Sequence, residues 1–320
     1  MLNVCQISLA RDIPIILENY YFFKKFYKSF KVFIICPKNE IDEFKNKLNF
    51  EEFNFIDEDT IISYQEFGNI FEALSGSINY RDSFRKRLGW YYQQILKLSF
   101  IINFVDINKE DIVIWDADTI ILKKITFFKD KYVKKYGTLF EYHKHYFKTN
   151  KSIIGEHPKY FISSLVQFIA LSVSECGFLK KNIANLSTAK GEKKISIKLT
   201  NIILKNIFKN HKSYNGSLFS EYELIGISNY MFKNDKQKAL FTLRNKLNGK
   251  LTKRQIFLAQ LLGVKHVTYE HSHLNKNSQG MLERKQSWIS FIKILFKEFV
   301  KFNLRNIKHN FYFYYNLINE

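Results

Sequence analysis

The stretch from Ile112 to Leu122, IVIWDADTIIL, restricts the fold of this chain more than any other feature. The apolar run Ile112–Trp115 leads directly into two aspartates separated by one alanine, and a second apolar run follows. Continuous runs of branched apolar residues are typical of strands that are buried on both faces of a parallel sheet. Open α/β sheets bind their ligands beyond the carboxyl ends of such strands. The stretch therefore predicts a central strand that places Asp116 and Asp118 at a binding edge.

The two aspartates predict a metal site. Alternation along a strand would point Asp116 and Asp118 the same way, with Ala117 opposite. Two like charges this close repel each other, and a cation between them would relieve the repulsion. Because carboxylate oxygens favour hard ions, we expect Mg²⁺ or Mn²⁺, which would also bind diphosphate oxygens. The alternative is a turn or a helix N-cap without a ligand, since aspartate is common in both.

Strand and helix patterns alternate before this stretch. Strands are predicted at 3–9, 31–36 and 53–56, and helices at 15–26 and 41–48. This order predicts an α/β fold with a doubly wound, mostly parallel sheet. The first loop lacks the G-x-G-x-x-G pattern of dinucleotide-binding folds. Ser8 and Asp12, near the end of the first strand, are expected to contact a nucleotide, although Asp12 could equally be a first-turn helix acid.

A helix is predicted from Leu88, after an irregular basic segment at 60–88 that ends in Arg87. Its apolar stripe consists of Tyr91, Ile95, Leu98 and Ile102, and its adjoining polar face of Trp90, Gln93, Gln94 and Lys97. An aromatic ring, two amides and an amine on one face can stack on a sugar or base, bind hydroxyls and neutralise phosphate. The face therefore predicts donor binding, and Arg87 is expected to contact phosphate, with a solvated basic surface as its alternative.

A second acidic group follows at 220–223, where Ser217 or Ser220 is expected to cap a new helix. Glu221 or Glu223 is a candidate general base toward an acceptor hydroxyl. The competing interpretation is that both acids only complement the helix dipole.

A late strand at 264–269 leads to His271 and His273. One of them is expected to join the two aspartates as a metal ligand, giving two carboxylates and one imidazole. His143 and His145 are weaker candidates, because neighbouring loop histidines are usually exposed.

The remaining segments are mostly basic. They comprise a linker with helical content at 125–136, a strand at 137–142, a helical insertion or surface element at about 179–212 and two amphipathic helices at about 234–262. We expect one domain over 1–280 and a basic, aromatic helical tail over 281–320. The tail has the composition of an interfacial helix on an anionic membrane, and packing back onto the domain is the competing interpretation.

Composition limits the partners. The chain has 320 residues and a formal net charge of +20, which favours anionic partners. No nucleic-acid-binding motif occurs, so nucleic acid is not expected. Three widely spaced cysteines indicate free thiols in a reducing compartment. With no signal-peptide pattern and no apolar span, we expect a cytoplasmic protein, with attachment to the inner face of the membrane as an added possibility.

Three blocks, GWYYQQILKL, IVIWDADTIIL and FSEYELIG, together resemble a group of bacterial glycosyltransferases of polysaccharide (capsule or lipopolysaccharide) clusters with the GT-A fold. The resemblance implies transfer of a sugar from a nucleotide diphosphate sugar, with Mn²⁺ or Mg²⁺ between enzyme and diphosphate. Asp116 and Asp118 match the family's Asp-x-Asp. The resemblance also implies that the 88–98 helix binds the donor and that the 221–223 acids act on the acceptor.

The expected function is therefore a metal-dependent glycosyltransferase of the hexosyl or N-acetylhexosaminyl class that acts on a growing cell-surface polysaccharide or a lipid-linked glycan. Ser164 and Gln167, in the 161–171 segment, are assigned to the acceptor side. Whether the reaction inverts or retains the anomeric configuration stays open. The alternatives are a nucleotidyl- or phosphotransferase of polysaccharide assembly, or a non-catalytic membrane-associated polysaccharide-binding protein.

Overall fold

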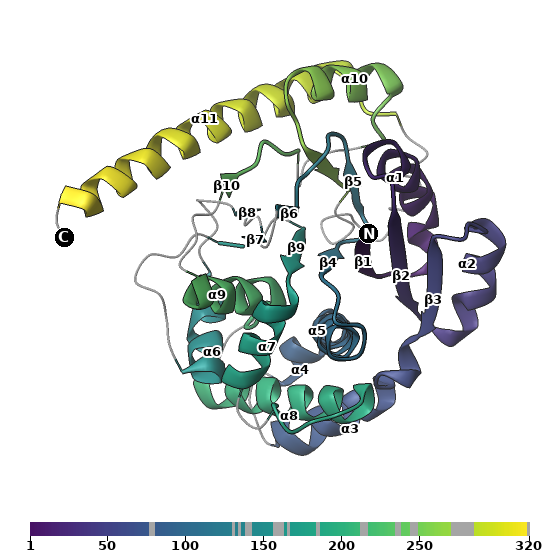
Figure 1. The fold of residues 1–320 in the computed structure, drawn as a ribbon, viewed down its shortest axis with the longest axis vertical. Coiled ribbons are helices and arrows are strands. Elements are labelled where there is room, and N and C mark those ends of the chain that lie inside the picture. Colours follow the sequence, from purple (N-terminus) through teal and green to yellow (C-terminus); the bar gives the residue numbers. More distant parts are fainter. Residues whose placement is uncertain are drawn as a thin grey trace.

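A five-stranded sheet forms the centre of the protein (Figure 1). The computed structural model describes residues 1–76, 81–129, 132–133, 136–137, 143–155, 163–164, 167–183, 186–211, 217–233, 238–243, 249–269 and 285–318. The strands of the sheet are β1 (Leu2–Ile7), β2 (Phe30–Cys36), β3 (Phe53–Asp57), β4 (Ile112–Trp115) and β9 (Phe168–Leu171). Their order is β3-β2-β1-β4-β9, and only β9 runs antiparallel to its neighbour. The predicted mostly parallel α/β sheet is confirmed.

Both faces of the sheet are covered by helices, so alternate residues of each strand enter different cores. Val113 and Trp115 of β4 pack with α1 (Ile13–Phe26) and α2 (Ile41–Lys47). Ile112 and Ile114 face the opposite way, toward α5 (Leu88–Asn108). This explains why β4 is an uninterrupted apolar run, since both of its faces lose contact with water.

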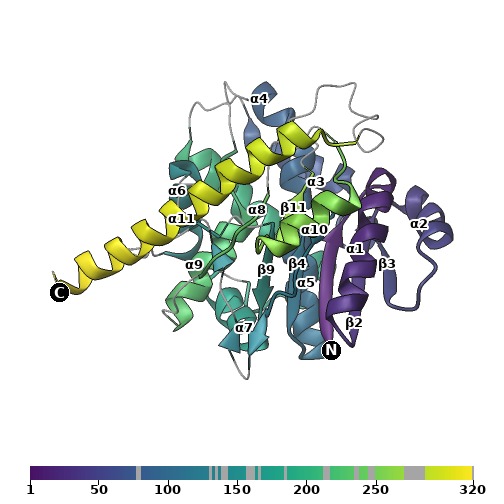
Figure 2. The same cartoon turned by 90° about the horizontal axis from the view of Figure 1, so that it is seen from above.

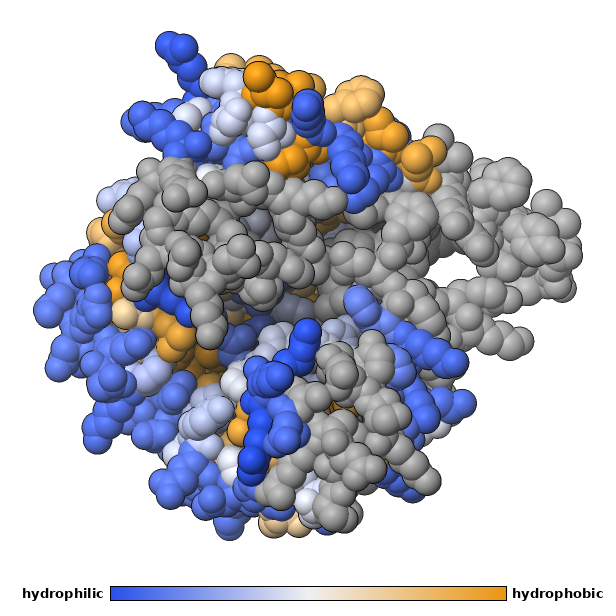
Figure 3. Space-filling view, turned by 180° about the vertical axis from the view of Figure 1, so that it is seen from behind, coloured by the Kyte–Doolittle hydropathy of each residue, from blue (hydrophilic) through white to orange (hydrophobic). Residues whose placement is uncertain are grey.

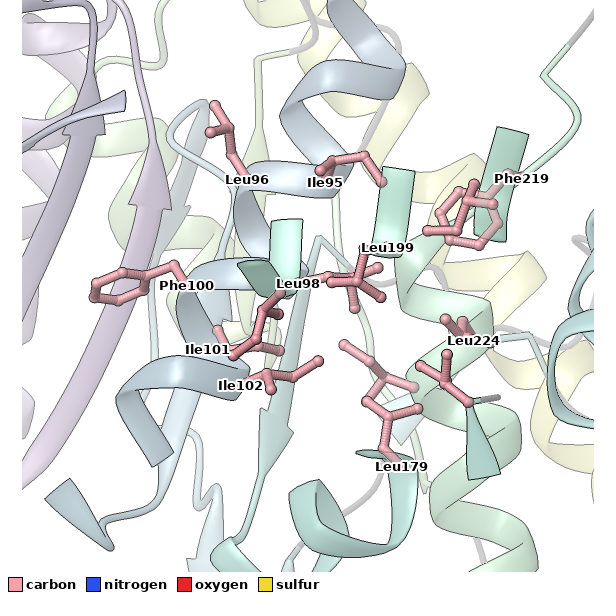
Figure 4. Packing of buried hydrophobic residues seen from close by; sticks show 14 of the residues in the cluster. Ile95, Leu96, Leu98, Phe100, Ile101, Ile102, Leu179, Leu199, Phe219 and Leu224 are labelled. Carbon is pink, nitrogen blue, oxygen red and sulfur yellow. The ribbon is translucent and has the colours of Figure 1, made fainter. Parts of the chain in front are cut away.

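The core under α5 is the larger one, and Figure 4 shows how its side chains interdigitate. The predicted apolar stripe of this helix is buried, with Ile95 and Leu98 at its centre. Helices α7 (Val173–Asn182), α8 (Glu192–Asn210) and α9 (Glu221–Lys233) complete this core. Helix α8 buries Ile195, Leu199 and Ile203 against this core, while Lys193 and Lys205 are exposed on its other side.

A smaller core lies beyond the end of β4. There, β5 (Thr119–Ile121) pairs antiparallel with β11 (His266–Thr268). Helices α10 (Lys253–Leu261) and α11 (Trp288–Ile318) pack over this pair through apolar side chains that include Phe291 and Leu295. Figure 2 shows α11 crossing the molecule beside α10 and extending past its body.

The other elements complete the chain. They are the 3₁₀ turns at Ala10–Asp12, Lys38–Glu40 and Glu58–Thr60, the helices α3 (Tyr64–Ser75), α4 (Arg81–Arg85) and α6 (Lys144–Ile154), and the short strands β6 (Phe128–Lys129), β7 (Tyr132–Val133), β8 (Tyr136–Gly137) and β10 (Lys238–Ala239). The three cysteines are buried and free, as predicted. Within the described residues, no helix has both the length and the apolar character needed to span a membrane.

Three predictions of secondary structure were wrong. The described residues of the 60–88 segment are largely helical, because Ser63 and Glu66 form a capping box that starts α3, whose Phe67 and Phe71 enter the core. The 125–136 linker contains the β6–β7 hairpin in place of helix. Of the two helices expected at 234–262, the first is absent in the described part, where β10 lies instead.

Candidate active site

The Asp-Ala-Asp triplet lies in a tight turn between β4 and β5. The amide of Thr119 donates to the carbonyl of Asp116 at 3.0 Å, which closes the turn. Asp116 and Asp118 are both partly exposed, while Ala117 is buried. The expected separation of acids from alanine is thus found, but a turn produces it and not strand alternation, since β4 ends at Trp115.

Two distant segments hold this turn in place. The carbonyl of Gln167 accepts from the amide of Asp116 at 2.9 Å, and the amide of Tyr269 donates to the carbonyl of Asp118 at 2.9 Å. Gln167 has a φ of 61°, in the left-handed region that is uncommon for residues other than glycine. The backbone on both sides of the turn is therefore fixed by tertiary contacts.

Lys97 is the centre of the site. Its Nζ donates to Asp116 Oδ1 at 2.7 Å and to Glu221 Oε1 at 2.8 Å. Only 6% of Lys97 and 3% of Glu221 are exposed, so this ion triad is largely shielded from water. Burial alone would lower the pKa of the lysine, but the two carboxylates outweigh it and raise the pKa, which keeps Lys97 charged.

Tyr222 completes the contacts around Asp116. Its hydroxyl donates to Asp116 Oδ1 at 2.6 Å, and its ring lies below Lys97, with Nζ 4.9 Å from the ring centre. Burial, together with the nearby Asp116 and Glu221 carboxylates, raises the pKa of this phenol well above its usual value. Tyr222 carries no functional signal of its own in the sequence, although its place between the two glutamates makes it a neighbour of any site built there.

Gln94 and the start of α9 are joined by a direct hydrogen bond. The Oε1 of Gln94 accepts from the amide of Glu221 at 3.0 Å, and its Nε2 donates to the carbonyl of Trp90. Because both ends of this amide are used and the residue is 2% exposed, Gln94 fixes the helix N-terminus. Trp90 and Gln93, from the same predicted face, are half-buried.

Glu223 is fully buried and faces a different set of groups. Ser163 Oγ donates to its Oε1 at 2.5 Å, and the amide of Ser164 donates to its Oε2 at 3.2 Å. Ser220 Oγ accepts from the amide of Glu223 at 3.4 Å, which confirms Ser220 as a capping residue. Of the two predicted acceptor-side residues, Ser164 thus lies beside the acidic block, where the two carboxylate oxygens of Glu223 hold it together with Ser163.

The outer part of the site contains Arg87 and Tyr146. The guanidinium of the exposed Arg87 donates to Ser217 Oγ at 2.5 Å. Burial raises the pKa of Tyr146 to about 12, while a hydrogen bond from Ser217 opposes the rise. The Trp90 and Tyr146 rings stack at a centroid distance of 6.4 Å. Tyr146 was not singled out in the sequence, because its spacing within α6 gives no sign of a partner in α5.

Ser8 and Asp12 lie at the same edge of the sheet, at the end of β1. The carboxylate of Asp12 accepts from the amide of Leu9 at 3.1 Å and so closes the 3₁₀ turn that precedes α1. This contact is the one expected of a first-turn helix acid. Ser8 is 1% exposed, with its amide bonded to the carbonyl of Ile35.

The metal prediction depends on a small set of donors. Asp116 and Asp118 supply carboxylates suited to a hard cation, and Asp116 Oδ2 makes no hydrogen bond within the described part of the chain. His271 and His273 lie outside the described residues. Among those described, no group of three or more histidine, cysteine or acidic side chains is arranged to hold an ion. The two aspartates fit such an ion as a partial ligand set.

His143 and His145 are not joined to the Asp116 turn by any contact between described residues. His145 faces His211 with 3.3 Å between their Nδ1 atoms, and His143 contacts the ring of Tyr146 at the outer part of the site. The structure thus brings His143 to the outer part of the site but joins neither histidine to the two aspartates.

Two solved structures resemble this fold weakly. The apo form of mouse xyloside xylosyltransferase 1 has a TM-score of 0.41 at 10% identity, covering 86% of this chain and 99% of that chain. The galactosyltransferase LgtC, in complex with donor and acceptor sugar analogs, has a TM-score of 0.44 at 10% identity, covering 92% of this chain and 96% of that chain. Among curated proteins, none matches the sequence.

One protein family matches over most of the chain. The match runs from residue 14 to residue 240 and includes α5, the Asp-Ala-Asp turn and the start of α9. It excludes α10, β11 and α11. The chain belongs to the family described as "Family of unknown function (DUF6492)".

Proposed function

We propose that the protein is a metal-dependent glycosyltransferase of GT-A type, which moves a sugar from a nucleotide diphosphate sugar to a growing cell-surface polysaccharide or a lipid-linked glycan. The observation that carries the proposal is the Lys97 ion triad beside the Asp-Ala-Asp turn. It lies at the carboxyl end of β4, the edge where open α/β sheets bind their ligands.

The charge balance of this edge supports a divalent cation. Asp116 and Glu221 contact the Lys97 ammonium group, and Asp118 follows in the same turn, so these four residues together carry a formal net charge of −2. We propose Asp118 as the direct ligand of the ion, with Asp116, which binds Lys97 and Tyr222 through Oδ1, sharing the ion or lying nearer the donor ribose. His271 or His273, which follow Tyr269 in the sequence, are proposed as the third protein ligand.

Each side chain has a separate proposed task. Bound Mn²⁺ or Mg²⁺ would stabilise the negative charge that develops on the departing diphosphate. Lys97 and Tyr222 orient Asp116, and Asp116 Oδ2 is then directed to the ion or to the donor ribose. Trp90 and Gln93 are proposed to contact the donor sugar, and Arg87 its phosphates.

The two glutamates receive different tasks. Because Glu223 holds Ser163 and Ser164 with both oxygens, we propose that it positions the acceptor side through these serines and does not take a proton. Glu221 is the carboxylate next to Asp116, so it is the proposed contact to the acceptor hydroxyl, as a base if the reaction inverts and as an orienting group if it retains. Gln167, whose carbonyl accepts from the Asp116 amide, is proposed to contact the acceptor as well.

The proposal extends to the class of acceptor and to the location of the protein. The proposed acceptor is a glycan of bacterial capsule or lipopolysaccharide assembly, and the proposed location is the cytoplasm. The free state of the three buried cysteines supports a reducing compartment.

The proposal is tested by a screen of nucleotide sugars with the full-length protein. With Mn²⁺, we expect release of nucleotide diphosphate from one of them, and EDTA should abolish it. Asp118→Asn should lower turnover at least about 100-fold and weaken Mn²⁺ binding, measured by electron paramagnetic resonance. Asp106→Asn, on the same chain but at the far end of α5, is the matched control and should leave both unchanged. If pyrophosphate is released instead, or Asp118→Asn changes neither quantity, the proposal is wrong.

A further inference from the structure

Helix α11 has one face that no part of the described chain covers. Phe291 and Leu295 pack into the smaller core and are 0% and 4% exposed. Ile289 and Phe296, on the other side of the helix, are 71% and 69% exposed. A helix that contacts the domain along one stripe alone needs apolar residues on that stripe only. Packing on the described part of the domain therefore does not account for the second apolar stripe.

The exposed apolar residues of α11 are contiguous. Ile289, Ile292, Phe296 and Val300 follow one another at spacings of three and four residues, which places them along one line of an α-helix. Isolated exposed apolar residues are ordinary, but a continuous strip of them marks an interaction surface. We refer to these four residues as the apolar strip. The neighbouring α10, whose Gln255 side chain bonds the carbonyl of Gln286, adds two more exposed apolar residues, Phe257 and Leu261.

Basic residues run alongside the apolar strip. Lys293, Lys297 and Lys301 recur every four residues, so they form a second line on α11, at one edge of the strip. At 100° per residue, this line lies between the apolar strip and the buried stripe. In Figure 3 hydrophobic surface gathers along the upper edge of the molecule, over α10 and α11, with hydrophilic surface next to it.

We propose that the apolar strip of α11 docks onto the surface of an anionic lipid bilayer. A helix that lies in a membrane interface has an apolar stripe that enters the boundary of the acyl chains and basic residues that contact the headgroups. The net charge of +20 adds attraction between the whole protein and an anionic surface. The helix is not apolar enough to cross the bilayer, so it rests on one side of it.

A second copy of the chain is a poorer occupant of the strip. In a twofold antiparallel pairing through the strip, the lysine lines of both copies would fall along the same edge and repel each other. A bilayer of anionic lipids instead supplies opposite charge along the whole line. This inference does not rest on the proposed sugar transfer, because none of the described contacts of the candidate active site involves α11.

Flotation of the full-length protein with vesicles tests the inference. We expect binding to vesicles of phosphatidylcholine with 30% phosphatidylglycerol, and at least about tenfold weaker binding to phosphatidylcholine alone or in 0.5 M salt, since salt screens surface charges. The double variant Ile292→Ser, Phe296→Ser should bind the anionic vesicles at least about tenfold more weakly. Lys293→Glu with Lys297→Glu should have a similar effect.

Matched changes on other helices serve as controls. Ile107→Ser on α5, a residue 69% exposed, and Lys205→Glu on α8, an exposed lysine, should leave vesicle binding unchanged. Thermal unfolding of all variants verifies the fold, which these exposed positions should not disturb. The inference is wrong if the wild-type protein does not float with anionic vesicles or if the strip variants bind like the wild type. It is also wrong if those variants merely convert a dimer to a monomer in sedimentation experiments.

Discussion

The Nζ of Lys97 lies 2.7 Å from Oδ1 of Asp116, and this contact joins the middle of α5 to the turn after β4. The same ammonium group reaches Glu221, 124 residues further along the chain, at the start of α9. Three separate elements thus share one buried cation. Such a group stabilises the fold only while all three charges are present, because removing one partner leaves the others uncompensated.

Lys97→Met should lower the free energy of unfolding by roughly 3 kcal/mol, mainly because it leaves the buried Glu221 carboxylate without a counter-ion. Asp116, a quarter of whose side chain is exposed, should contribute less. Urea denaturation measures the change. The double variant Lys97→Met, Glu221→Gln removes both charges and should be more stable than Lys97→Met alone. Additive effects of the two substitutions would show that the ion pair carries no coupling energy.

Tyr222→Phe removes the hydroxyl that donates to Asp116 Oδ1 at 2.6 Å. Since this bond is to a charged group, we expect a loss of about 2 kcal/mol in unfolding free energy. In the proposed reaction Tyr222 orients Asp116, so kcat should fall more than about tenfold with little change in KM. Tyr21→Phe, at a residue 60% exposed, is the control and should change neither. Full activity of Tyr222→Phe would argue against the orienting role.

Glu223→Ala should destabilise the protein by about 3 kcal/mol, because it leaves the Ser163 hydroxyl and the Ser164 amide without their buried acceptor. Glu223→Gln keeps one acceptor oxygen and should cost less. If Glu223 only positions the acceptor side, Glu223→Gln should retain a large part of kcat. A loss of kcat as large as that of Asp118→Asn, with stability preserved, would instead identify Glu223 as a catalytic residue.

His211 should make stability depend on pH. Thr149 Oγ1 donates to the carbonyl of Leu218 and therefore accepts from His211 Nε2, which leaves His211 Nδ1 facing His145. Burial, followed by the His145 and Lys148 charges, lowers the pKa of His211 to about 4. The unfolded chain then binds more protons than the folded one between pH 4 and the ordinary value of about 6.5, so stability falls as pH decreases through this range.

The size of the His211 effect follows from these two values. Lowering the pH from 7 to 5 should cost about 2 kcal/mol through this residue. His211→Gln, which retains a donor for Thr149, should lose correspondingly less stability over the same interval in urea titrations. An equal pH dependence in both proteins would mean that other groups, such as the carboxylates, account for it.

Local patterns in the sequence were sufficient for much of the fold. The apolar run at 112–115 predicted β4, and helical spacing predicted both the buried stripe of α5 and its polar face with Lys97. These features depend only on which residues of one helix or strand lie on the same face. The periods of the helix and the strand are enough to predict this. The S-x-x-E pattern that begins at Ser63 is the signature of a capping box, so the start of α3 could also have been predicted from the sequence.

Only the tertiary structure decided which groups meet. Nothing in the spacing of Lys97 and Glu221 indicates that they pair, and nothing near Gln94 in the sequence indicates that its side chain binds the start of α9. The turn at Asp116 likewise depends on a hydrogen bond to the carbonyl of Gln167, the residue that directly precedes β9. Contacts between residues more than a hundred positions apart depend on how whole helices pack on the sheet. The sequence alone therefore pointed to Gln94, Lys97 and the acids of the candidate site, while packing determined which of these groups bind each other.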